Sequence, residues 1–108
     1  MSGTRACALS EVKDGDSLAV TVDGVDIAIV RDGSEIYAIR DECSHAAVPL
    51  SEGDVHGCEI ECWLHGSTFD LRTGKPTCLP ATEPVAIYPV SVEGDDVLVD
   101  VHTSLNTA

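Results

Sequence analysis

Aromatic residues are scarce in this sequence: its 108 residues include one Trp, one Phe and two Tyr. A single domain of this length therefore builds a modest core mainly from aliphatic side chains. Long hydrophobic runs are missing as well, and no apolar stretch approaches the ~20 residues of a membrane-spanning helix. The segment Met1–Arg5 does not resemble a secretory signal, so we expect a cytoplasmic protein without membrane association.

Basic residues are also few, and none occurs after Lys75. Six Lys and Arg against nineteen Asp and Glu give a formal net charge of −13. Such a charge repels nucleic acids and anionic membranes, so neither is expected as a partner. The acidity would attract the basic face of another protein, although solubility alone is a simpler explanation.

Signatures of catalysis are absent too. The sequence has no nucleophile–base pair, no phosphate-binding loop and no dinucleotide fingerprint. We therefore do not expect this chain to catalyse a reaction alone.

β-Branched residues, in contrast, are abundant: thirteen Val, six Ile and eight Thr make up a quarter of the chain. The pairs Asp23-Gly24 and Asp32-Gly33 are typical of tight hairpin turns. Alternating apolar residues predict strands within seven ranges: 5–12, 17–22, 25–31, 34–40, 58–61, 85–92 and 97–101. Turns are expected at 52–57 and 71–76, and a frayed tail at 102–108. The pattern predicts an all-β, antiparallel fold in which two stretches of sheet flank an inserted module at about 41–81.

The five cysteines are an odd number in a chain without a secretory signal, which argues against a disulfide framework. Two of them belong to short mixed motifs, Cys43-Ser44-His45 and Cys62-Trp63-Leu64-His65. The other three are expected to be small buried thiols, and no function is assigned to them: Cys7, Cys58 and Cys78. Two further histidines, His56 and His102, have no spacing partner and are expected at the surface.

Each motif offers one thiolate and one imidazole, and this mixture distinguishes two kinds of metal site. Structural zinc sites more often group two cysteines in one knuckle and two histidines on a helix. Mixed pairs suit a 2Fe–2S cluster with unlike ends, in which Cys43 and Cys62 bind one iron and His45 and His65 bind the other. Histidine ligation makes the oxidised centre nearly neutral, so it accepts an electron more easily than an all-cysteine cluster.

The spacing C-x-H-x16-C-x2-H, followed by Gly66, resembles that of the Rieske ferredoxins of bacterial multicomponent aromatic-ring dioxygenases of the biphenyl or phenylpropionate type. The resemblance extends from Leu9–Val12 to Val97–Val99 and so covers nearly the whole chain. It implies a single domain, 1–108, with the Rieske fold. An antiparallel β-sandwich base would comprise about 1–40 and 82–108, and a small cluster-binding subdomain about 41–81.

The same resemblance implies that Cys43, His45, Cys62 and His65 hold one Rieske 2Fe–2S cluster. It further implies a soluble electron carrier between a flavin-dependent ferredoxin reductase and a terminal oxygenase or other acceptor with a basic docking face. Pro80 would belong to a loop that covers the cluster.

Rieske proteins of respiratory complexes differ from this sequence at positions that matter for the reduction potential. Val48 and Leu64 stand where those proteins have a disulfide, and Phe69 stands where they have a tyrosine that donates to a ligand sulfur. Fewer donors near the sulfurs indicate a low-potential ferredoxin.

Three other functions fit the sequence. The chain could be an accessory ferredoxin of iron–sulfur cluster assembly, a zinc-stapled interaction domain, or a small subunit of a nitrite reductase, although such subunits often lack these four ligands. The colour of the purified protein separates zinc from iron–sulfur, and the neighbouring genes separate the other two.

Overall fold

The computed structural model describes residues 4–33, 35–42, 49–56, 58–62, 67–77, 84–103 and 105. They form ten strands and two short 3-10 helices, and no α-helix occurs in these ranges, so the all-β prediction is confirmed. The elements in chain order are β1 (Thr4–Ala8), η1 (Leu9–Glu11), β2 (Ser17–Val22), β3 (Val25–Asp32), β4 (Glu35–Arg40), η2 (Leu50–Glu52), β5 (Val55–His56), β6 (Glu59–Glu61), β7 (Thr68–Asp70), β8 (Ile87–Tyr88), β9 (Val90–Glu93) and β10 (Asp96–Val99). Nothing in the described part of the chain is a helix long and apolar enough to cross a membrane.

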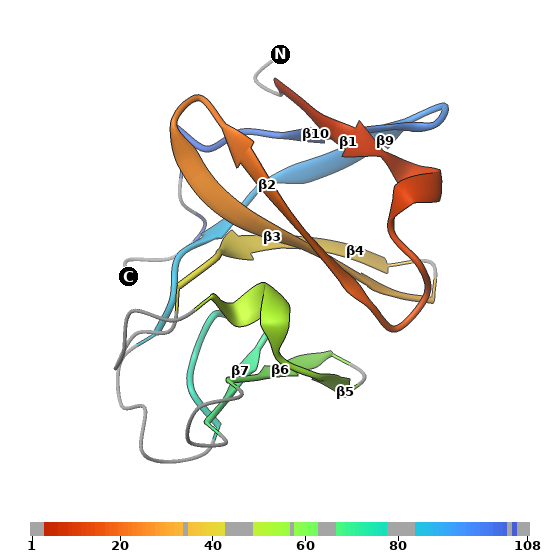
Figure 1. The fold of residues 1–108 in the computed structure, drawn as a ribbon. Helices are drawn as coiled ribbons and strands as arrows, with labels where there is room; N and C mark the ends of the chain where they lie inside the picture. Colours follow the sequence, from red (N-terminus) through yellow and green to blue (C-terminus); the bar gives the residue numbers. More distant parts are fainter. Residues whose placement is uncertain are drawn as a thin grey trace.

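Two antiparallel sheets make up one part of the molecule (Figure 1). One has the order β1-β10-β9, and the other has the order β2-β3-β4-β8. They enclose an aliphatic core of ten buried residues: Cys7, Val12, Val22, Ile27, Ile29, Ala38, Tyr88, Val97, Val99 and Val101. The alternation predicted for β2 and β10 is confirmed, because Val22, Val97 and Val99 all face this core.

The third sheet has the order β5-β6-β7 and lies below the other two in Figure 1. Its apolar residues share a second core with β3, β4 and β8: Ala28, Val30, Ile39, Leu50, Ile60, Cys62, Phe69, Leu71, Val85 and Ile87. All three of its strands lie within 41–81, the range assigned above to the inserted subdomain. The division of the domain into base and subdomain stays a prediction.

The hairpin between β2 and β3 has the predicted turn. Asp23 and Gly24 both adopt positive φ, 50° and 81°, as a type I′ turn requires. The second hairpin forms as well, but its turn lies one residue later than predicted. Asp32 already pairs with Glu35, and the turn begins at Gly33 with φ 61°.

Three local predictions were wrong. Residues 52–57 are not simply a turn, because Val55 and His56 pair with β6. The stretch from residue 85 is not one strand: Pro89 has no N–H to continue a ladder, and β8 and β9 belong to different sheets. The described part of the C-terminal segment is not frayed, since the Leu105 N–H donates to the Ile87 carbonyl at 2.8 Å.

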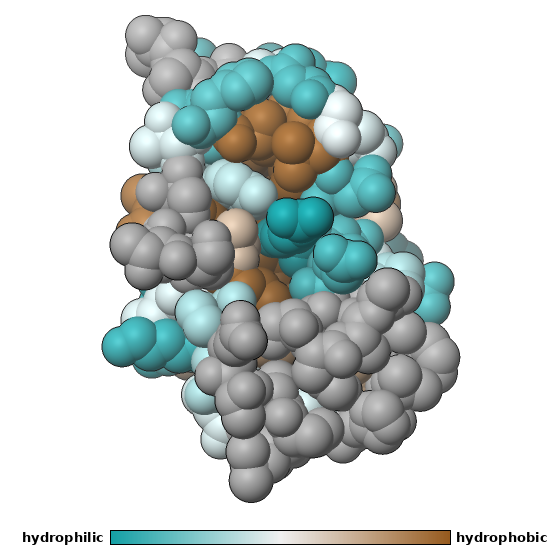
Figure 2. All heavy atoms as spheres, turned by 90° about the vertical axis from the view of Figure 1, so that its left-hand side faces the viewer, coloured by the Kyte–Doolittle hydropathy of each residue, from teal (hydrophilic) through white to brown (hydrophobic). Residues whose placement is uncertain are grey.

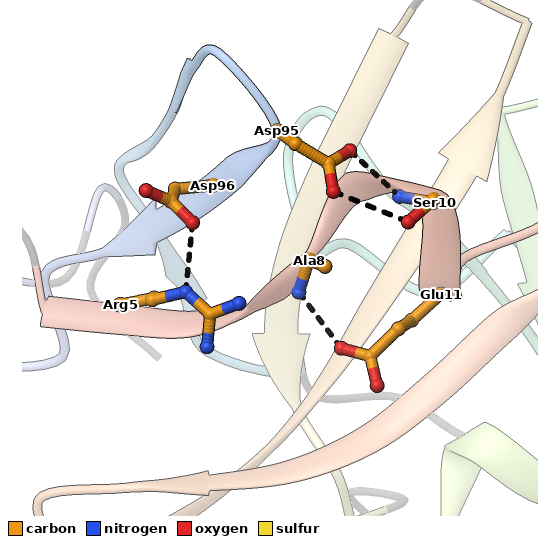
Figure 3. A network of polar contacts seen from close by, with 6 residues as sticks. All are labelled: Arg5, Ala8, Ser10, Glu11, Asp95 and Asp96. Carbon is orange, nitrogen blue, oxygen red and sulfur yellow. Dashed lines mark hydrogen bonds and ion pairs between the residues drawn. The ribbon is translucent and has the colours of Figure 1, made fainter.

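The turn between β9 and β10 holds η1 in place through the side chain of Asp95 (Figure 3). The Asp95 carboxylate accepts from the backbone N–H and the hydroxyl of Ser10, both at 3.2 Å. The Ala8 N–H donates to the Glu11 carboxylate at 2.8 Å. Asp96 pairs with Arg5 at 2.8 Å, but both side chains are more than half exposed. The two adjacent carboxylates therefore differ in kind, one anchoring a helix and the other forming a surface ion pair.

Replacing Asp95 with Ala should lower the free energy of unfolding by about 1 kcal/mol, because the N–H and the hydroxyl of Ser10 in η1 lose their acceptor. Asp96→Ala, the matched control, should cost much less, since an exposed ion pair contributes little. Urea unfolding of both variants at the same pH measures the difference. Equal losses would contradict the anchoring role of Asp95.

Candidate metal centre

One of the four predicted ligands, Cys62, lies within the described residues, directly after β6. It is fully buried in the core between the small sheet and the strands β3, β4 and β8. The other three lie outside the described residues: Cys43, His45 and His65. Accordingly, the described ranges contain no group of three His, Cys, Asp or Glu side chains that could hold a metal ion.

The second ligand motif belongs to the connection between β6 and β7. Its base is closed by the Cys62 N–H, which donates to the Ser67 carbonyl at 2.6 Å, just beyond the pair Glu61 and Thr68. Ser67 is fully buried, and Phe69 packs in the same core as Cys62. The backbone that carries Cys62 is thereby fixed by the hairpin.

Cys62 and Cys7 are both buried among apolar side chains, so burial alone does not identify a ligand. A thiolate among apolar side chains is strongly unfavourable without a compensating charge, and a bound cation supplies one. Thiolates and imidazoles together are donors for iron or zinc, not for calcium or magnesium. The residue types therefore fit an iron–sulfur cluster with mixed ligands.

The first ligand motif lies between β4 and η2. Directly after β4, the Asp41 N–H donates to the Asp26 carbonyl at 3.0 Å. The Asp41 carboxylate accepts from the backbone N–H of Ser51 at 2.7 Å and from its hydroxyl at 2.8 Å. The two ends of this segment are thus tied together.

The return of the first segment lies against the strand that leads to Cys62. The Glu61 N–H donates to the Asp54 carbonyl at 2.8 Å. A Cβ atom at Gly53 would lie 1.6 Å from the Glu61 carbonyl oxygen, so only glycine allows this approach. The chain that follows the first motif therefore meets the chain that precedes the second at one junction, Gly53–Asp54 against Glu61.

The predicted cover loop at 79–82, including Pro80, lies outside the described residues, as do Cys78 and Trp63. The segments on either side of it are hydrogen-bonded to β7 and to the turn that follows β7. The Thr77 N–H donates to the Thr68 carbonyl at 2.7 Å, and the Val85 N–H donates to the Gly74 carbonyl at 2.8 Å.

The remaining predicted thiols differ from one another. Cys7 is buried as predicted, and this burial raises the pKa of its thiol, with a smaller contribution from Glu11. Cys58 is partly exposed, so the prediction of a buried thiol was wrong there. Its side chain is the main cause of the raised pKa of Arg72, which also pairs with Asp70 at 3.5 Å. Burial likewise raises the pKa of Tyr37.

His102 is exposed as predicted, and its Nε2 lies 3.1 Å from the Asp23 carboxylate. The side chain of His56 lies outside what the structure describes.

The sequence did not predict the structural roles of three residues near the site: Asp41, Ser51 and Gly53. Asp41, two residues before Cys43, suggested only surface charge, and no sequence pattern pairs it with Ser51.

Comparison with known proteins places these features in a family. The model of the Rieske [2Fe-2S] domain matches residues 3–89. The ferredoxin component of the naphthalene 1,2-dioxygenase system of Pseudomonas aeruginosa is 44% identical over 95 residues, which is 88% of this chain and 91% of the relative. The 3-phenylpropionate/cinnamic acid dioxygenase ferredoxin subunit of Escherichia coli K12 is 43% identical over 101 residues, 93% of this chain and 94% of the relative.

Among solved structures, the complex of reduced oxygenase and oxidised ferredoxin in carbazole 1,9a-dioxygenase contains a similar chain. It has a TM-score of 0.85 and 35% identity, and the match covers 91% of this chain and 92% of that one. These likenesses support the iron–sulfur interpretation over a zinc-stapled domain. They also favour an oxygenase ferredoxin over an accessory of cluster assembly.

Gly53→Ala should destabilise the protein by about 1–3 kcal/mol, because the new methyl group forces Glu61 away from η2. It should also lower the metal content, since Cys62 follows Glu61. The control is Gly24→Ala, where only the positive φ opposes the substitution and no atom lies within 4 Å. Urea unfolding and metal analysis of both variants test this. A Gly53→Ala protein with undiminished metal would contradict the junction's role.

Proposed function

The chain belongs to the family of Rieske [2Fe-2S] domains, and from this premise we propose that it is the ferredoxin of a multicomponent oxygenase system. It takes single electrons from a flavin-dependent ferredoxin reductase and passes them to a terminal oxygenase. The observation that carries the proposal is the likeness, over 91% of the chain, to a chain of the carbazole oxygenase–ferredoxin complex. Its relatives are ferredoxin components of dioxygenase systems, so the chain is an electron-transfer component and not a catalyst alone.

The domain holds one Rieske [2Fe-2S] cluster, which supplies a one-electron redox couple when bound. Cys43 and Cys62 are proposed as its thiolate ligands, and His45 and His65 as its imidazole ligands. The apolar core around Cys62 supports this assignment because it keeps water from the sulfur. The two relatives serve different aromatic substrates at nearly equal identity, so the final substrate is left open.

The subdomain boundaries and the place in the cell are part of the same proposal. The subdomain at about 41–81 would present the histidine end of the cluster to partners, while about 1–40 and 82–108 form its support. A cytoplasmic location fits an electron carrier that meets a flavin reductase.

The ligand assignment can be tested with two buried thiols. As isolated under anaerobic conditions, the protein should be red-brown and contain two irons and two labile sulfides per chain, as a [2Fe-2S] domain requires. Cys62→Ala should abolish the colour, because the thiolate is lost. Cys7→Ala removes a buried thiol from the other core and should keep it. Iron, sulfide and zinc analysis decides, and a colourless wild-type protein with stoichiometric zinc would overturn the function.

A basic docking face on the partners would complement the net charge of −13. Acidic residues near the first ligand motif line a hollow of about 310 Å³, formed by Gly24, Val25, Asp26, Arg40, Asp41, Glu42 and Tyr88. Figure 2 shows hydrophilic residues around a depression on the side of the molecule where the β2–β3 turn lies. Glu42 is a better probe of docking than the neighbouring Asp41, which is hydrogen-bonded to Ser51. The only described contact of Glu42 is an exposed ion pair with Arg40 at 3.5 Å.

Glu42→Lys should slow reduction by the cognate flavin reductase at low salt, because it places positive charge on the approach face. Raising salt from 0.1 M to 1 M shortens the Debye length from about 10 Å to about 3 Å and should remove the difference. Glu93→Lys, on β9 in the other sheet, is the charge-matched control. Stopped-flow rates at limiting protein concentration measure the effect. Equal slowing by both variants would mean that the acidity acts only through net charge.

A further inference from the structure

Asp41 links the two ends of the first ligand segment. Its backbone N–H donates to the Asp26 carbonyl on β3 at 3.0 Å, which fixes Asp41 against the base sheet. Its carboxylate accepts from both donors of Ser51, at 2.7 and 2.8 Å. Cys43 and His45 lie in the sequence between these two residues.

The same carboxylate supplies a helix cap that the local sequence lacks. The residue before η2 is Pro49, whose side chain has no acceptor and makes no capping hydrogen bond. The first N–H groups of a helix have no partner within it, and the Ser51 N–H is one of them. Asp41, ten residues upstream and partly buried, accepts from it at 2.7 Å.

Ser51 is itself held on the base of the molecule. Its carbonyl accepts from the Ser17 hydroxyl on β2 at 2.9 Å. The preceding Leu50 is fully buried against Ala28 and Val30 of β3. The link from Asp41 to Ser51 therefore connects the end of β4 with η2, on either side of the segment that contains Cys43 and His45.

We propose that Asp41 is a positioning residue of the metal centre. Its two hydrogen bonds to Ser51 close the base of the first ligand segment, so that Cys43 and His45 are presented in one arrangement and the cluster is retained. The inference rests on the proposed function and deepens it. It concerns hydrogen bonding, not the negative charge of the residue.

Three variants separate these effects. Asp41→Ala removes both hydrogen bonds and one charge. Asp26→Ala removes a charge from the same hollow but breaks only a side-chain bond with Thr21 at 2.9 Å, and it leaves the Asp26 carbonyl in place. Asp41→Asn removes the charge but can still accept from the Ser51 N–H and donate to the Ser51 hydroxyl.

The primary measurement is the rate of cluster loss, followed by visible absorbance in the presence of a ferrous-iron chelator. Asp41→Ala should lose its cluster about tenfold faster than the wild type, the change that corresponds to the net contribution of about one hydrogen bond. Asp26→Ala and Asp41→Asn should remain within about threefold of the wild type, because both keep the closure of the segment.

Two further readouts separate positioning from general stability. The reduced-state EPR spectrum of Asp41→Ala should broaden or split, because His45 is no longer held in one arrangement. Amide exchange at Ser51 should accelerate in the apo protein, which does not depend on the cluster. The spectrum of Asp26→Ala should match that of the wild type.

Cluster loss and EPR spectra that are the same for Asp41→Ala and Asp26→Ala would overturn the proposal, as would an Asn variant as labile as the Ala variant. If Asp41→Ala does not fold, Ser51→Ala removes only the 2.8 Å bond and should give a smaller acceleration in the same direction. No acceleration in Ser51→Ala would then count against the proposal. A wild-type protein without iron would defeat the proposed function instead, which keeps the two failures distinct.

Discussion

The structure depends on β3, because four consecutive residues of this strand are fully buried and alternate between the two cores. Ile27 and Ile29 face the core between the two larger sheets, and Ala28 and Val30 face the core shared with the small sheet. Strands that are buried on both faces have near-continuous apolar runs, as β3 does. Because β3 contributes to both cores, the small sheet packs against a strand that the larger sheets also hold.

On this support, the segments that contain the proposed ligands and the predicted cover loop are bounded by hydrogen bonds among described residues. Asp41 and Ser51 close the first, the Cys62 N–H closes the second, and the ends of the third are fixed through Thr77 and Val85. Most of these contacts lie directly beside a strand or η2, so they continue the hydrogen bonding of the sheets into the connections. Fixing both ends of a loop removes much of the entropy that a ligand set would otherwise lose on binding a cluster.

The acidity of the chain divides into two kinds of carboxylate. Asp41 and Asp95 each hold the start of a 3-10 helix by accepting from serine donors, and substitutions there change the structure. Glu42 and Glu93 lie exposed, and their charge can be reversed with little structural effect. A net charge of −13 therefore does not describe a uniform docking surface, and only the exposed carboxylates are suitable probes of partner association.

The sequence alone determined the all-β class, the β2–β3 turn and the family, because alternation, Asp23-Gly24 and the Cys/His spacing are local signals. The assignment of Cys43, His45, Cys62 and His65 as ligands also comes from the sequence and stays a prediction. Only the tertiary structure decided the roles of Asp41 and Gly53, and the split of the chain at Pro89 between two sheets. These depend on residues about ten positions apart, or on a sheet formed by distant strands, and such contacts have no periodic signature in the chain.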